Sequence, residues 1–226
     1  MANHLDLEEQ EQLDQLKHFW NTWGTLISVV LLVVAGSLAA WNGYRFWQEK
    51  QSSQAAALFD AIETAATVND QARLEQGFAD IRGKYAGTVQ AGHAGLLVAK
   101  SATTAGNLAL AKSALTWVAD QAHDEGHKAL ARLRLSALLI EEKAYDNALA
   151  QLAAPFPSEY SAVVADRRGD LMVLQGKKAE AVAEYSKAYK DFPENVEYRR
   201  LVEIKLSALG EQPQVVAASA SQEASK

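Results

Sequence analysis

Residues 24–41 read GTLISVVLLVVAGSLAAW, and this stretch decides how the rest of the chain is organised. It lies in a run from His18 to Tyr44 that contains no Asp, Glu, Lys or Arg. At a rise of about 1.5 Å per residue, a helix of this length spans roughly 27 Å, close to the hydrocarbon thickness of a bilayer. We therefore predict a transmembrane helix rather than the buried helix of a soluble protein. Tryptophans flank the stretch at both ends, where indole rings favour the headgroup region: Trp20, Trp23, Trp41 and Trp47.

A cleaved signal peptide is the alternative, because Ser37-Leu38-Ala39 resembles a cleavage site. A signal peptide, however, begins with a short, positively charged segment. Residues 1–17 instead carry five acidic side chains and the single basic residue Lys17. We therefore predict a retained anchor. Flanking charge leaves its orientation open, since Arg45 and Lys50 exceed Lys17 by one positive charge, a margin that only slightly favours a cytoplasmic C-terminal domain.

Composition limits what the remaining chain can do. The 226 residues carry a formal net charge of -6, most of it in the acidic N-terminal segment, so nothing indicates a nucleic-acid-binding surface. The chain has no cysteine, which excludes disulfides and thiolate chemistry. Residues 5–20 fit either a weakly amphipathic helix that enters the membrane or a partly ordered tail.

The chain after Trp47 predicts an all-α domain. Apolar residues recur there at helical spacing, as in Gln51–Thr67 and Gln71–Ile81, and no segment sustains the period-two alternation of a strand. The segment Thr103–Asn107 contains the residues typical of a loop between helices.

The C-terminal half repeats at the period of tetratricopeptide helix hairpins. Ala111, Ala148 and Ala181 occupy equivalent positions, separated by 37 and 33 residues. A period near 34 is that of tetratricopeptide repeats. In the last unit we expect Gly169 and Ala181 to face each other where the paired helices come closest. The small, aromatic and proline positions of that unit are the best match to the pattern: Gly169, Ala181, Tyr185, Ala188 and Pro193.

No residue set predicts catalysis. His123 and His127 are spaced to share a metal on a helix face, but Asp124 stands where the zinc-protease pattern requires Glu. The competing interpretation is a capped turn between two helices. We predict no enzyme activity, no metal and no cofactor.

One surface merits a functional hypothesis. In hairpin repeats the first helix of each pair lines the concave face, and side chains of mixed charge and apolar character there suit contact with a polypeptide. The alternative is a solvated groove without a dedicated ligand. The candidate residues are Leu130, Leu133, Arg134, Ile140, Val163, Asp166, Arg167, Asp170 and Val173.

The order of these features resembles the YfgM family of ancillary subunits of the bacterial SecYEG translocon. The resemblance rests on Leu16-Lys17-x-Phe19-Trp20 before the span, Trp41-x-x-Tyr44 after it, and the segment Val164–Asp170 in the repeats. It implies a single-pass inner-membrane protein with a cytoplasmic N-terminus and a periplasmic repeat domain. It further implies association with the SecYEG translocon, with a PpiD-type periplasmic chaperone and with secreted polypeptides.

We thus expect an all-α protein with one N-terminal transmembrane helix followed by a tetratricopeptide-like solenoid. The expected divisions are an acidic cytoplasmic tail (1–22), the anchor (23–47), the repeat domain (48–210) and a disordered tail (211–226). The alternative function is a membrane-anchored repeat scaffold for another envelope complex.

Overall fold

The computed structural model describes the backbone of residues 7–212 and the side chains of residues 11–212, and these residues form helices without a strand. The predicted all-α class is therefore confirmed. The chain divides into two units, Met1–Ser53 and Gln54–Lys226, here called the membrane unit and the repeat unit. Most of the predicted disordered tail, residues 213–226, lies outside the described residues, as do residues 1–6 of the acidic tail.

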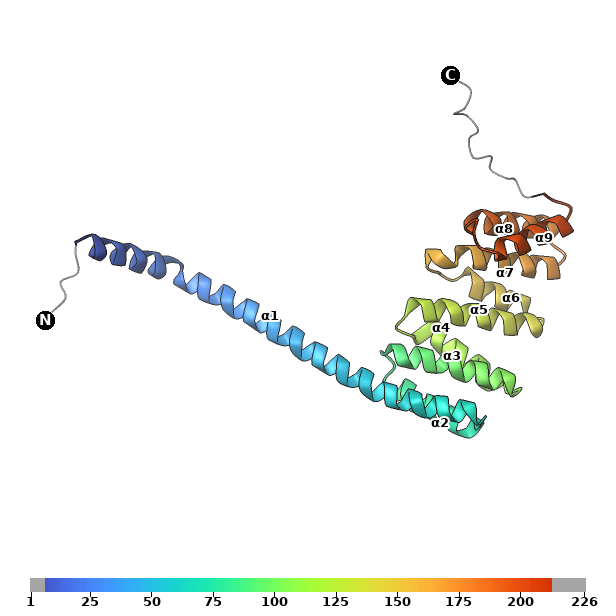
Figure 1. Cartoon of the computed structure of the whole chain (residues 1–226), viewed down its shortest axis with the longest axis horizontal. Helices are drawn as coiled ribbons and strands as arrows, with labels where there is room; N and C mark the ends of the chain where they lie inside the picture. Colours follow the sequence, from blue (N-terminus) through green and yellow to red (C-terminus); the bar gives the residue numbers. More distant parts are fainter. Residues whose placement is uncertain (1–6, 213–226) are drawn as a thin grey trace, which may run out of the picture. The chain divides into compact units, whose positions relative to one another are not determined.

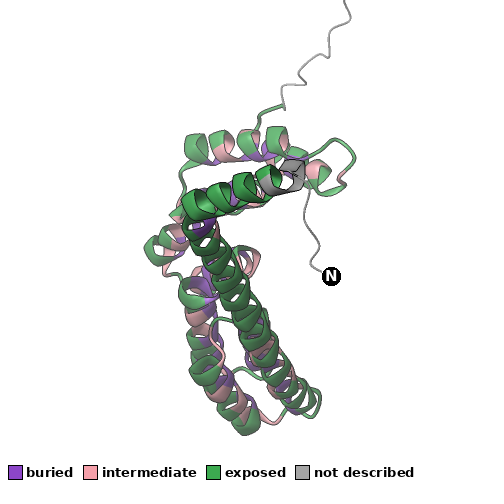
Figure 2. Ribbon diagram, turned by 90° about the vertical axis from the view of Figure 1, so that its left-hand side faces the viewer, coloured by how far each residue is buried: buried purple, intermediate pink, exposed green. Residues whose placement is uncertain are grey.

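The membrane unit consists of the first part of α1 (Leu7–Thr67). Most of its apolar side chains are exposed, and Leu31, Leu32 and Val33 are 62%, 72% and 62% exposed. Figure 2 shows this stretch of α1 as exposed along its length. Among the described residues, α1 is the one helix long and apolar enough to cross a membrane. Exposed aliphatic side chains on every side of a helix fit a lipid environment, as the prediction of a transmembrane helix requires.

The repeat unit begins with the last turns of α1 and continues through a series of antiparallel helix pairs. Figure 1 shows its helices stacked in chain order, with α2 at one end and α9 at the other. The elements are α2 (Gln71–Lys84), α3 (Val89–Thr104), α4 (Leu108–Gln121), α5 (Glu125–Glu141), α6 (Tyr145–Ala153), the 3-10 turn η1 (Ser158–Tyr160), α7 (Ser161–Leu174), α8 (Lys178–Asp191) and α9 (Tyr198–Ala208).

The turn within each hairpin has the same backbone conformation. One residue per turn adopts a positive φ: Asn69, Gly106, Lys143 and Gly176. Gly210 adopts the same conformation at the end of α9, and φ at the five positions lies between 54° and 81°. The next amide donates to a carbonyl five residues back, as Asn107 N does to Ala102 O at 2.8 Å and Lys177 N to Met172 O at 2.9 Å. This left-handed C-terminal cap ends the first helix and begins the second. The intervals of 37, 37, 33 and 34 residues between these positions define the repeat register.

The predicted small-residue positions are at the centre of the packing. Ala111, Ala148 and Ala181 are each fully buried. The expected contact between Gly169 and Ala181 stays a prediction, and the nearest neighbour of Gly169 is Tyr185. A Cβ added to Gly169 would lie 2.5 Å from two atoms of the Tyr185 ring. The glycine is therefore required by the aromatic side chain of the second helix.

Candidate protein-binding face

The first helices of the hairpins carry a matching row of accessible side chains. On α5 these are Leu130, Arg134, Ala137 and Glu141, and on α7 they are Val163, Arg167, Asp170 and Leu174; none is buried. The spacing i, i+4, i+7, i+11 places each set on one side of its helix. The same spacing continues to α3 with His93, Leu97, Lys100 and Thr104, and to α9 with Leu201, Ile204 and Ala208. We call these four rows together the open face.

Several residues predicted for the concave face lie elsewhere. Leu133 and Ile140 pack against a buried cluster that includes Leu152 and Leu171, so they join one hairpin to the next. Asp166 is 0% exposed. In the repeat register Asp166 is equivalent to Leu133, which explains why both point toward the following first helix. Val173 is 43% exposed and neighbours Leu174 at the end of α7. The other five predicted residues lie within the open face.

A buried polar network fixes α9 to α7. Asp166 accepts hydrogen bonds from the Tyr198 hydroxyl at 2.8 Å and from Lys205 Nζ at 2.7 Å. Asp170 accepts from Lys205 Nζ at 2.6 Å and from the Tyr185 hydroxyl at 2.7 Å. The aspartates therefore bind α9 to the array and are occupied by partners within the chain.

The same network sets the protonation of its members. Burial alone would lower the pKa of Lys205, but its hydrogen bonds to Asp166 and Asp170 outweigh burial and raise the pKa. Burial and the hydrogen bond to Asp170 raise the pKa of Tyr185. Burial and the hydrogen bond to Asp166 likewise raise the pKa of Tyr198. The lysine thus stays charged and both phenols stay neutral at physiological pH.

A groove of about 310 Å³ opens between α3, α4 and α5. Lys100 from α3 and both Arg134 and Glu141 from α5 line it, together with two threonines and small or apolar side chains. Arg134 donates one weak hydrogen bond to Leu96 O at 3.4 Å. Within the described residues neither Lys100 nor Arg134 has a carboxylate within ion-pair distance. The groove therefore offers two cationic groups to a ligand.

The histidines are arranged for packing. The His93 ring stacks on Phe59 with centroids 4.8 Å apart and on His127 with centroids 5.8 Å apart. Asp124 caps α5 by accepting from His127 N at 2.8 Å, as the capped-turn interpretation requires. Burial lowers the pKa of His127, which opposes protonation in this stack. Among the described residues no group of three potential ligands could hold a metal ion.

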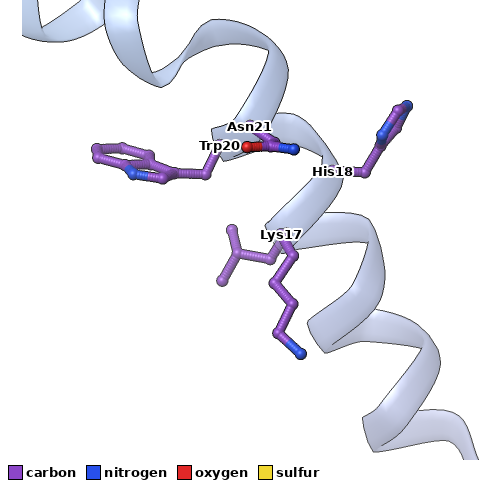
Figure 3. A pocket seen from close by; sticks show the side chains of 5 residues that line it. Lys17, His18, Trp20 and Asn21 are labelled. Atoms are coloured by element: carbon purple, nitrogen blue, oxygen red, sulfur yellow. The ribbon is translucent and has the colours of Figure 1, made fainter.

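A second hollow, of about 810 Å³, lies along α1 beside Leu16, Lys17, His18, Trp20 and Asn21. Figure 3 shows these side chains pointing in different directions from one helix, with the Trp20 and His18 rings on opposite sides. They do not converge on a common point. The Trp20 ring instead packs against the backbone at Gly24, where an added Cβ would lie 3.3 Å from three of its atoms.

Lys100, Leu174, Leu201 and Ile204 are among the residues of the open face that the sequence did not identify. The usable signal was the register of the turn residues, because Gly106, Gly176 and Gly210 are visible in the sequence and fix where each first helix ends. Counting back from them places Lys100 and Leu174 in the last turns of α3 and α7.

Comparison with known proteins gives the family. The model of a tetratricopeptide repeat-like domain matches residues 17–211. A Neisseria gonorrhoeae protein named ancillary SecYEG translocon subunit is 31% identical over 213 residues, which cover 92% of this chain and 100% of the relative. The chain belongs to the family of ancillary SecYEG translocon subunits.

Other relatives carry the same name. The Haemophilus influenzae protein is 30% identical over 80% of this chain and 89% of its own length. The Escherichia coli K12 protein is 26% identical over 75% of this chain and 82% of its own length. No solved structure matches the chain. The family match begins at residue 17 and thus includes the anchor as well as the repeats, which agrees with the predicted combination of one span and a repeat array.

Proposed function

We propose that this protein is an ancillary subunit of the SecYEG translocon, held in the inner membrane by α1. The observation that carries the proposal is similarity to a named translocon subunit along nearly the whole chain, anchor included. In this arrangement the N-terminus is cytoplasmic and the repeat unit is periplasmic, where the open face binds a PpiD-type chaperone or emerging secreted polypeptides. Open rows of mixed charge and apolar character support that role for the repeat unit.

Affinity purification from gently solubilised membranes tests the association. The full chain carries the affinity tag, and the expected result is co-purification of translocon subunits and the chaperone. Recovery of a different envelope complex without translocon subunits would refute the proposal and favour the alternative of a general scaffold.

Protease treatment tests the orientation. Protease added to spheroplasts should digest the repeat unit while the cells remain intact. Digestion that requires lysis would place the repeat unit in the cytoplasm and would contradict the proposed contact with secreted chains.

We further propose that the repeat unit provides most of the affinity for the chaperone, while the span confines both proteins to one membrane. Confinement raises effective concentration without adding a contact. Exchange of residues 24–41 for an unrelated span of equal length should preserve chaperone recovery, and Arg134→Glu with Arg167→Glu should reduce it. The matched control is Lys187→Glu with Lys190→Glu, which reverses two exposed charges on α8. Recovery that is lost on the span exchange but survives the arginine reversal would refute this division of roles.

A further inference from the structure

The two ends of the open face differ in chemistry. The groove between α3 and α5 is lined by Lys100, Arg134 and Glu141, so its cationic groups outnumber its carboxylate by one. Within the described residues neither cation has a carboxylate within 4 Å. Arg167, one helix further along, lies 3.7 Å from the Asp170 carboxylate. Positive charge that is available to a ligand therefore concentrates at the α3 and α5 end.

The opposite end is apolar. Leu174 on α7 is 52% exposed, and on α9 Leu201 and Ile204 are 41% and 58% exposed. Of the eight large hydrophobic side chains exposed among the described residues of the repeat unit, five lie between Val173 and Ile204. Single exposed aliphatic residues are ordinary, but a group on adjacent helices marks an interaction surface. The eight are Val68, Val89, Leu108, Val173, Leu174, Tyr198, Leu201 and Ile204.

We propose that the open face binds an extended polypeptide segment that places an acidic side chain in the groove between α3 and α5 and aliphatic side chains on α7 and α9. This inference rests on the proposed function and specifies its ligand. Charge complementarity selects the acidic group, because Lys100 and Arg134 give a carboxylate two cationic donors. The aliphatic group covers Leu174, Leu201 and Ile204 and removes their surface from water.

The geometry also sets a spacing. From the α3–α5 groove to the α7–α9 surface is two helix separations, about 20 Å at the usual interaxial distance. An extended chain advances about 3.3 Å per residue, so the acidic and aliphatic side chains should be about six residues apart. A segment with the same residues placed next to each other reaches only one of the two sites.

The experiment measures binding of two labelled peptides of identical composition to the full chain in nanodiscs, by fluorescence anisotropy. In the spaced peptide a Glu pair and a Leu pair are separated by five Ser or Ala residues, and in the compact peptide the pairs are adjacent. The spaced peptide should bind about tenfold tighter, as expected for one additional charge-assisted contact. Equal affinity of the two peptides would overturn the spacing and, with it, the proposal.

Two single substitutions test which peptide side chain binds at each end of the open face. Arg134→Gln should weaken the spaced peptide about tenfold and leave a peptide with Gln in place of Glu unaffected. Leu201→Ser should weaken the spaced peptide but not one with Ser in place of Leu, and Leu108→Ser, an exposed leucine on α4, is its matched control. If either substitution weakens the substituted peptide as much as the spaced peptide, the assignment of Glu to the groove and Leu to the α7 and α9 surface is refuted.

This result is separable from the proposed function. Translocon subunits that co-purify while the two peptides bind equally would leave the proposed function standing and overturn the ligand. A spaced peptide that binds as expected, from a protein that co-purifies no translocon subunit, would support the ligand and refute the translocon role.

Discussion

Replacement of Gly169 by Ala should destabilise the repeat unit although alanine is the better helix former. In α7 the change gains about 0.5–1 kcal/mol of helix propensity. The added Cβ, however, would lie 2.5 Å from two atoms of the Tyr185 ring. Tyr185 cannot move aside freely, because it is 3% exposed and its hydroxyl donates to Asp170 at 2.7 Å. Overpacking of this kind costs about 1–3 kcal/mol, so the net effect is a loss of roughly 1–2 kcal/mol.

The measurement is the thermal unfolding midpoint of the full chain in detergent, followed by circular dichroism. For a domain of this size, a loss of that order lowers the midpoint by roughly 2–8 °C. Gly83→Ala is the matched control, because Gly83 lies in α2 and an added Cβ there meets no atom within 4 Å. The control should raise the midpoint. If Gly169→Ala also raises the midpoint, contact with Tyr185 is not the reason that glycine occupies this position.

Three further changes test the turns and the titrating groups. Lys143→Gly should stabilise the fold by about 0.5–1 kcal/mol in chemical denaturation, since Lys143 has a φ of 62° that favours glycine. Lys187→Gly, at an exposed position in the middle of α8, should destabilise it. Burial lowers the pKa of His127 in the folded state below its unfolded-state pKa of about 6.5. The neutral imidazole therefore contributes fully to the free energy of unfolding above about pH 6.5, and this contribution is lost as the pH falls through the folded-state pKa. The midpoint of His127→Gln should therefore depend less on pH below 6.5 than that of the exposed control His123→Gln, and equal slopes would contradict the assignment. The pKa of Lys205 is raised in the folded state, so its contribution to the free energy of unfolding is complete below the unfolded-state pKa of about 10.4 and is lost as the pH rises through the folded-state pKa. Lys205→Met should therefore be less stable than the unmodified chain at pH 7 and should lose less stability than that chain above pH 10.

The sequence predicted the span, helices over the first hairpin and the repeat register of the later hairpins, but not the register of the first hairpin. The repeat register explains the difference. The positions of Gly169 and Ala181 in the last hairpin correspond to Ile62 and Leu74 in the first, and both of these large residues are buried. A search for small residues therefore passes over the last part of α1 and α2. Gly77 supplies the missing space instead, since a Cβ there would lie 2.7 Å from Ile62.

The candidate face was predicted in part for a similar reason. A count from one small residue identifies the turn of the helix but not which of its sides is covered by the next hairpin. Arg134 and Arg167 are exposed, whereas Leu133 and Asp166, one residue earlier, face the neighbouring helix. A change of one residue on a helix rotates the side chain by about 100°, which is enough to turn a surface position into a core position.

The way α9 is attached connects the fold to the proposed ligand. An array of hairpins needs a terminal helix that covers the last core and presents a polar outer side. In α9, Val202 and Leu206 cover the core, and Lys205 joins Asp166 and Asp170 through hydrogen bonds of 2.6–2.7 Å. These contacts account for the cap, and Leu201 and Ile204 take no part in the buried core. Stability of the array therefore does not require aliphatic side chains at these two positions, and polar residues would reduce aggregation. Their presence beside Leu174, on the side of α9 that continues the open face, is what contact with an aliphatic segment of a partner would require.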